Sequence, residues 1–147
     1  MNSLTAVATG PFSWDFYHTV RDEFVGSIRF EVLNVEKKTC ELFWDAGDVV
    51  FERENIIEAH QRAIGFAIFD LKFVSVNTAS AVDDLDTQNL YEAVGFLSGR
   101  DFSKGKFRYR RFSADRYDLV IKLATAFMGQ HLDLGLWSFG FDSAKKR

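Results

Sequence analysis

The spacing of apolar residues changes near Glu54, from a period of two to a period of three to four. Before this point, the run GSIRFEVLNV places Ile28, Phe30 and Val32 on one face and charged residues on the other, which is typical of a half-buried strand. After it, apolar residues recur at helical spacing over residues 54–70. The chain therefore has to combine a sheet with helices in one fold.

The same reading predicts the order of the other elements. A short helix is expected over residues 14–24, followed by a three-stranded meander over 27–53 and then by three helix–strand repeats. The third helix is expected to stop at Gly99, the fourth to begin at Ser113, and the last strand to cover 134–141. This order predicts an α+β protein with a single mixed, mostly antiparallel sheet covered by about four helices. A mostly parallel α/β sheet is the alternative.

Length and composition fit one domain. With 47% hydrophobic and 27% charged residues, residues 1–147 are expected to form a single globular domain, with 1–12 as a leader free to move and 143–147 as a solvated tail. Cys40 is the only cysteine, which favours a reducing compartment. Neither a secretory signal nor a run of about 18 apolar residues is present, so a soluble, cytoplasmic protein without a membrane partner is predicted.

One segment carries most of the unusual charge. The net charge is −3, yet five cations lie within residues 104–111: Lys104, Lys106, Arg108, Arg110 and Arg111. Alternation along a strand places Lys106, Arg108 and Arg110 on one face, opposite Phe107 and Tyr109. This pattern predicts a strand with one solvated face. The alternative is a surface that binds nucleic acid through residues 104–111, with the cations on phosphates and aromatic rings stacked on bases.

A short fragment resembles a known enzyme family. LYEAVGF, residues 90–96, is similar to a run found late in GNAT-type acetyltransferases, where the tyrosine lies near acetyl-CoA and can protonate the departing thiolate. The resemblance implies that role for Tyr91. It also implies a phosphate-binding loop of the form Arg/Gln-x-x-Gly-x-Gly/Ala, whose backbone amides hold a pyrophosphate at the start of a helix.

RAIGFA fits that loop pattern through Arg62, Gly65 and Ala67. These residues fall inside the helix predicted over 54–70, whereas the family's loop comes directly after a strand and opens a helix. In placement, therefore, this second motif departs from the family.

Other chemically active residues show no partner at a diagnostic spacing. Asp15, His18 and Asp22 share one face of the predicted first helix, but that face is opposite the apolar one and reads as solvated. We predict neither a metal nor a cofactor. The roles of His18, His60, His131 and Cys40 stay open.

Three functional hypotheses follow. The first is a non-catalytic, aromatic-rich intracellular module, an adaptor or inhibitor that binds another protein or a second copy of itself through its surface. It rests on the absence of complete catalytic motifs and on a surplus of aromatic residues, sixteen Phe among them. The candidate interface is a face of the last strand formed by Trp137, Phe139 and Phe141. The second, with nucleic acid as the less favoured partner, uses the basic strand. The third is a small GNAT-like acyltransferase that uses Tyr91.

Overall fold

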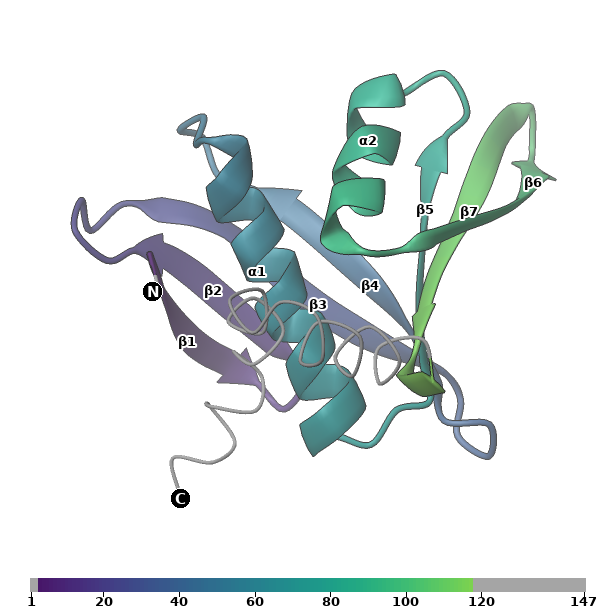
Figure 1. The fold of residues 1–147 in the computed structure, drawn as a ribbon, viewed down its shortest axis with the longest axis horizontal. Helices are drawn as coiled ribbons and strands as arrows, with labels where there is room; N and C mark the ends of the chain where they lie inside the picture. The colour runs from purple at the N-terminus through teal and green to yellow at the C-terminus, as the bar shows by residue number, and fades with distance from the viewer. Residues whose placement is uncertain (1–2, 118–147) are drawn as a thin grey trace, which may run out of the picture.

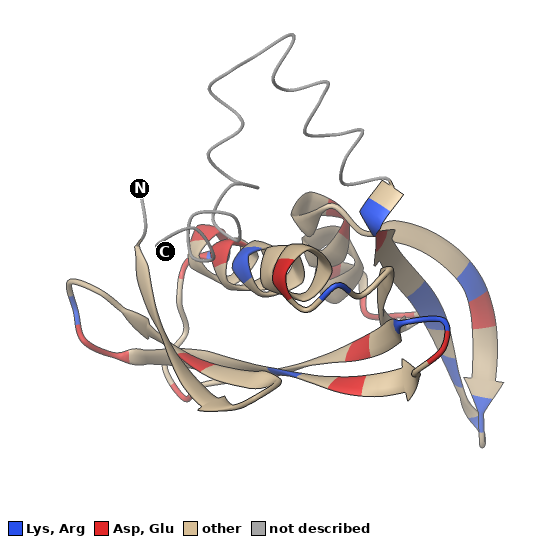
Figure 2. Ribbon diagram, turned by 90° about the horizontal axis from the view of Figure 1, so that it is seen from below, with Lys and Arg blue, Asp and Glu red and all other residues tan. Residues whose placement is uncertain are grey.

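The computed structural model describes residues 3–117, which form one sheet with helices packed on one of its faces (Figures 1 and 2). Within these residues the elements are β1 (Leu4–Gly10), β2 (Ser13–His18), β3 (Phe24–Asn34), β4 (Thr39–Ala46), α1 (Arg53–Gly65), a π-helical turn η1 (Phe66–Asp70), β5 (Ser75–Ala81), α2 (Leu85–Val94), β6 (Leu97–Lys104) and β7 (Phe107–Asp115).

The seven strands follow the order β1-β2-β3-β4-β5-β7-β6. Every neighbouring pair is antiparallel except β4 and β5, which run parallel because α1 connects them across one face of the sheet. This single parallel junction divides the sheet into an N-terminal four-stranded part and a C-terminal three-stranded part.

The core lies between α1, α2 and the sheet. Period-two alternation turns Ile28 of β3, Leu42 of β4 and Val76 of β5 toward the helices, and each is at most 1% exposed. Ile64 of α1 and Ile68 of η1 cover them from the helical side and are fully buried. Burial on this scale, about 1.5–3 kcal/mol for each large apolar side chain, holds α1 over the strands that form the parallel junction.

The prediction of about four helices over a mostly antiparallel meander was wrong. Residues 3–117 contain two α-helices and one π-helical turn over a seven-stranded mixed sheet. The expected helix at 14–24 is strand β2, because Trp14 and Phe16 pack inward at a spacing of two while Val20 is 87% exposed. Part of the expected leader forms β1, which pairs with β2.

Two helix boundaries also differ from expectation. Helix α2 ends at Gly95, whose φ of 121° is a conformation that glycine adopts without strain, so the chain is already in β6 at Gly99. Ser113 does not cap a helix but pairs with Asn77 inside the sheet. The remaining predictions, for the helix after Ser113, the strand at 134–141 and the solvated tail, fall on residues 118–147, outside the described part of the chain.

None of the helices within residues 3–117 is long and apolar enough to cross a lipid bilayer.

Close packing between β3 and β4 gives a first prediction. A Cβ added at Gly26 would lie 2.3 Å from Cη2 of Trp44, whose ring is itself held 5.0 Å from the ring of His60. We expect Gly26→Ala to lower the free energy of unfolding by about 1–3 kcal/mol and to shift tryptophan fluorescence. Urea unfolding measures the first effect.

Gly99→Ala is the matched control, because a Cβ there meets Arg111 at an ordinary 3.7 Å. Equal stability of the Gly26 and Gly99 variants would contradict the prediction.

Candidate functional site

The parallel pair of strands separates after three positions. Backbone pairing of β4 with β5 ends at Glu41 and Asn77. At this point hydrogen bonds from side chains of β5 to the backbone of β4 connect the two strands. Nδ2 of Asn77 donates to the carbonyl of Cys40 (3.3 Å), and Oγ1 of Thr78 donates to the carbonyl of Leu42 (3.2 Å). Beyond this point β4 stays with β3 and β5 stays with β7, so a wedge opens in the middle of the sheet.

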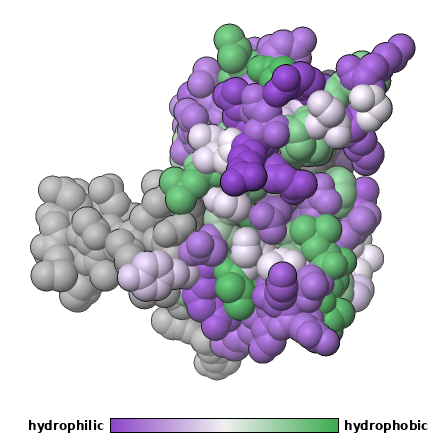
Figure 3. Space-filling model, turned by 90° about the vertical axis from the view of Figure 1, so that its right-hand side faces the viewer, coloured by the Kyte–Doolittle hydropathy of each residue, from purple (hydrophilic) through white to green (hydrophobic). Residues whose placement is uncertain are grey.

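A cavity of about 530 Å³ occupies the wedge. The residues that line it come from β3 and β4, β5, α2 and the β6–β7 hairpin: Leu33, Glu41, Leu42, Phe43, Trp44, Asn77, Thr78, Ala79, Tyr91, Phe102, Lys104, Tyr109 and Arg111. Hydrophilic side chains cover much of the face seen in Figure 3, with residues of intermediate and high hydropathy among them. This volume accommodates a small organic molecule.

Tyr91 reaches the cavity from α2. The side chain of Asp84 caps the helix by accepting a hydrogen bond from the amide of Thr87 (3.2 Å), which fixes the start of the helix. Gln88, Tyr91 and Val94, at spacings of three, then form its buried face. The helix expected to continue to Gly99 stops earlier, and Leu97 lies in β6 with 51% of its surface exposed.

The environment of Tyr91 keeps its proton in place. Its ring packs edge-on against Phe96 and Phe112 at 5.5 and 5.3 Å, and the residue is 7% exposed. Burial raises the pKa of the Tyr91 hydroxyl, since the charged phenolate is poorly solvated there. The hydroxyl lies 3.5 Å from Oγ1 of Thr78, at the outer limit of a hydrogen bond. A neutral hydroxyl that donates no strong hydrogen bond within residues 3–117, beside a cavity, is suited to donate to a ligand.

His60 of α1 lies directly behind this group. It is fully buried, with its ring 5.0 Å from that of Trp44 and 6.1 Å from that of Tyr91. Nδ1 is 2.8 Å from the carbonyl of Ile56, and Nε2 has no hydrogen-bond partner among residues 3–117. Burial lowers the pKa of His60 to about 4, so the imidazole is neutral at pH 7 with its proton on Nδ1. His60, whose role the sequence left open, is a core residue.

The hairpin of β6 and β7 carries the basic segment, visible as a run of blue in Figure 2. Arg108 and Arg110 of β7 lie close to Asp101 of β6, with a distance of 2.7 Å from Nε of Arg110 to the carboxylate and 3.7 Å from Arg108. The hydrogen bond from Arg110 lowers the pKa of Asp101. Part of the predicted basic surface is therefore neutralised within the hairpin. Lys104 and Arg111 instead line the cavity.

The second part of the family resemblance fails in the structure. Arg62 and Gly65 lie in the last turn of α1 and Ala67 in η1, so they form no loop ahead of a helix. Arg62 donates to the carbonyl of Leu4 (2.7 Å) and lies 3.7 Å from Glu58, which ties it to β1. Its role is structural.

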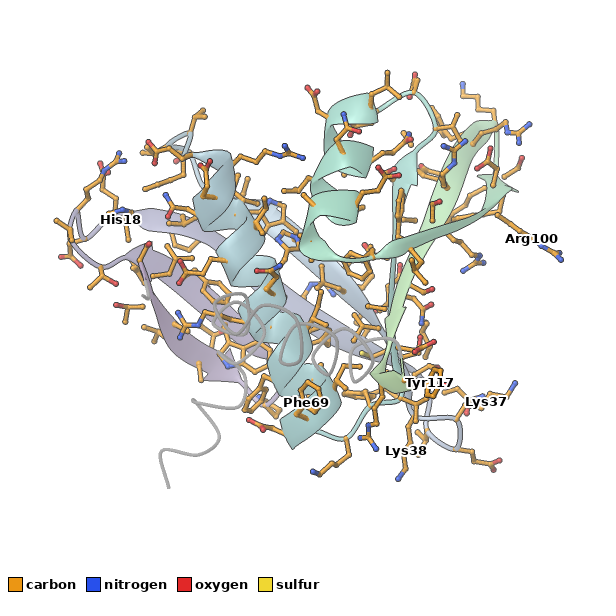
Figure 4. All side chains as sticks on the ribbon, in the orientation of Figure 1. His18, Lys37, Lys38, Phe69, Arg100 and Tyr117 are labelled. Carbon is orange, nitrogen blue, oxygen red and sulfur yellow. The ribbon has the colours of Figure 1, made fainter. Side chains whose placement is uncertain are left out.

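The remaining sequence candidates do not form a site. Cys40 is fully buried, and burial raises the pKa of its thiol to about 12, which makes it a poor nucleophile. His18 lies at the end of β2, far from the hairpin (Figure 4), and Asp15 is no longer on the same face of a helix. Within residues 3–117, no group of three metal-binding side chains comes together. His131 and the aromatic face at Trp137, Phe139 and Phe141 lie outside the described residues.

Sequence patterns missed several residues of the cavity. Glu41, Trp44 and Thr78 carry no motif, and they meet only because β4 and β5 separate where they do. Phe102 and Lys104 could have been found from Gly105, which marks a hairpin turn between two runs of alternating residues.

Comparison with solved structures places this fold among acetyltransferases. An acetyltransferase of the GNAT family from Bacillus anthracis matches with a TM-score of 0.62 at 16% identity, over 70% of this chain and 65% of that one. The chain thus spans slightly less than two thirds of that protein. Spermidine/spermine N-acetyltransferase SpeG from Vibrio cholerae matches with a TM-score of 0.65 at 13% identity, over 75% of this chain and 68% of that one. At these identities the likeness establishes the fold.

No protein-family model matches the chain, and no curated protein matches it.

The fold contradicts our first functional hypothesis. A non-catalytic adaptor or inhibitor, with protein binding as its main activity, was expected because the catalytic motifs looked incomplete. The solved structures named above, which share this fold, are acetyltransferases, and this agrees better with the third hypothesis.

Proposed function

We propose that the protein is an acyltransferase that moves an acyl group from a thioester to an amine in the wedge between β4 and β5, with Tyr91 as the general acid. The observation that carries the proposal is the position of Tyr91: the residue lines the cavity, and its hydroxyl lies 3.5 Å from Oγ1 of Thr78, where the parallel strands separate. The fold shared with acetyltransferases supports it.

The wedge offers what such a reaction requires. Beyond Leu42 and Thr78 the two strands no longer pair with each other, so backbone groups at Trp44 and Ala79 can bind the amide groups of an extended ligand. The thioester supplies the activated acyl carbon. Tyr91 donates its proton to the sulfur as the carbon–sulfur bond breaks, and the incoming amine loses a proton as its bond to the acyl carbon forms. Glu41, the carboxylate among the lining residues, is placed to take that proton or to hold the amine.

The start of α1 does not fit a nucleotide diphosphate. The segment 47–52, GDVVFE, has no Gly-x-Gly pattern, and Asp48, Glu52 and Glu54 place negative charge around the first turn of the helix. Arg53 donates to the carbonyl of Asn89 (2.9 Å). Acidic residues at a helix start favour the helix itself but repel an anion. We therefore assign no contact between this chain and the diphosphate of coenzyme A. We propose instead that the protein recognises the donor through its pantetheine arm, which carries the thioester.

This assignment predicts how the donor should behave. We expect acetyl-CoA and S-acetylpantetheine to support acyl transfer with kcat/KM values within about tenfold of each other. A diphosphate held by several charge-assisted hydrogen bonds, at about 1.5–3 kcal/mol each, would separate them by about a hundredfold or more. Release of thiol, followed with a chromogenic disulfide in the presence of mixed primary amines, measures both donors.

The two arms of this experiment separate two claims. No thiol release with either donor and any amine would overturn the acyltransferase proposal. Turnover with acetyl-CoA alone would retain the acyltransferase and overturn the assignment of donor recognition to the arm.

The compartment and the partners of the protein are also part of this proposal. The single cysteine, buried in the core, is consistent with a cytoplasmic enzyme. Pairing with a second copy of the chain through Trp137, Phe139 and Phe141 stays a prediction that sedimentation of the full chain would test.

A further inference from the structure

One face of the β6–β7 hairpin combines aromatic rings with cations. Residues that pair directly across two strands share a face, and Phe102 pairs with Tyr109. Their rings are stacked with centroids 5.6 Å apart and an angle of 27° between planes. Lys104 and Arg111, each two positions along its own strand from one of these rings, lie on the same face, and the guanidinium of Arg111 is 4.5 Å from the centre of the Phe102 ring.

The cations on this face are not neutralised by the acidic residue of the hairpin. Asp101 lies on the opposite face, where it contacts Arg108 and Arg110. Lys104 and Arg111 are exposed, and neither forms an ion pair with an acidic side chain in the described part of the chain. Arg100, at the bulge of β6, points away from the body of the protein (Figure 4). The uncompensated positive charge on this face therefore comes from two residues.

This face closes one side of the cavity that holds Tyr91. Phe102, Lys104, Tyr109 and Arg111 line it together, with Glu41 from β4 as the acidic member. The cavity thus presents a carboxylate where the strands separate and cations beside two aromatic rings on the hairpin. A ligand complementary to it carries an amine, a planar ring and an anionic group.

We propose that the acceptor of the acyl group is a small amine that carries both an aromatic ring and a carboxylate or a similar anion. Its ring lies against Phe102 and Tyr109, its anion contacts Lys104 and Arg111, and its amine is directed to Glu41 and Tyr91. The assignment rests on the proposed acyltransferase function and names its substrate class. It sets this chain apart from spermidine/spermine N-acetyltransferase SpeG, whose polyamine substrates are cations that Lys104 and Arg111 would repel.

The test uses binding to the full chain in the absence of any thioester. 4-(Aminomethyl)benzoate carries all three groups, benzylamine lacks the anion, and spermidine lacks both ring and anion. Calorimetry should give a Kd for 4-(aminomethyl)benzoate at least about tenfold lower than for either of the other two, because an anion gains charge-assisted hydrogen bonds to two cations. Equal or tighter binding of spermidine would overturn the proposal.

Paired variants locate the site. Lys104→Gln combined with Arg111→Gln should weaken 4-(aminomethyl)benzoate about tenfold or more, whereas Lys106→Gln combined with Arg108→Gln, on the same hairpin, should leave its Kd within about twofold. Equal effects of the two pairs would contradict the assignment.

A single-stranded oligonucleotide that binds more tightly than 4-(aminomethyl)benzoate, and that loses affinity in the Lys106/Arg108 pair, would overturn the proposal in favour of nucleic-acid binding. Acyl transfer to 4-(aminomethyl)benzoate is measured separately. Binding of 4-(aminomethyl)benzoate without transfer would contradict the acyltransferase function and retain the anion site. Transfer to spermidine alone would retain the acyltransferase function and contradict the anion site.

Discussion

Tyr91→Phe is expected to lower kcat for acyl transfer by about 10²–10⁴-fold, the range that general acid catalysis supplies. The substitution removes one oxygen and keeps the ring that packs against Phe96 and Phe112. Because Thr78 already donates to the carbonyl of Leu42, no strongly bound partner is left unpaired when the tyrosine oxygen is removed. The folded structure should persist, so steady-state rates on the purified variant measure the loss of the acid itself.

Two features make this result specific. Tyr17→Phe is the matched control, since Tyr17 is half-buried in β2 and packs edge-on against Phe24 at 5.6 Å, away from the cavity; its kcat should stay within about twofold. Burial raises the pKa of Tyr91, so the wild-type rate should show no loss of an essential acid up to pH 9. A Tyr91→Phe enzyme with unchanged kcat would rule out the assigned role.

The sequence predicted β3, β4 and the helix over 54–70 because, in a long segment, the spacing of apolar residues is enough to distinguish a strand from a helix. The prediction of a helix at 14–24 failed because the six residues of β2 fit the apolar spacing of either a strand or a helix. Only the pairing of β2 with β1 and β3 decides between the two. Strand β6 was missed because LSGRDFSK has little apolar alternation and is held by β7. Such segments take their structure from partners distant in the chain.

Three residues that line the cavity were among the sequence candidates: Tyr91, Lys104 and Arg111. Tyr91 came from a resemblance of seven residues, and the structure places it on the cavity. The sequence could not identify Glu41 and Thr78, because these residues line the cavity only as a result of where β4 separates from β5. The basic strand was read with aromatic rings and cations on opposite faces; with β6 beside it, Phe102 and Lys104 bring both kinds of residue onto one face. A single strand pattern cannot show this.

Acid is expected to destabilise the protein through His60. The unfolded chain binds a proton at His60 below pH 6.5, whereas the folded protein binds it only near pH 4, because burial lowers the pKa of the imidazole. Between these values the unfolded state holds more protons, so stability is fully present above pH 6.5 and is lost as the pH falls to 4. At about 1.4 kcal/mol for each unit of pKa, the loss amounts to about 3 kcal/mol.

His60→Leu isolates this contribution. All other titrating groups are common to the two proteins, so their contributions cancel in the difference between the two free energies of unfolding. Between pH 7 and pH 4 this difference should change by about 3 kcal/mol in favour of the variant. At pH 7 the variant should be close to wild type in stability, because leucine fills the core without the unpaired Nε2 that histidine leaves there. Urea unfolding at half-unit pH steps gives both values.

Cys40→Ala provides the control for a general weakening of the core. Its thiol, with a pKa raised to about 12, exchanges no proton in this range, so it should lower stability by a constant amount at every pH. If the His60→Leu difference were also constant from pH 7 to pH 4, the imidazole would have to be solvated or paired in the folded protein. Its Nε2 would then open toward the wedge and the acyl-transfer site instead of lying sealed behind Trp44 and Tyr91.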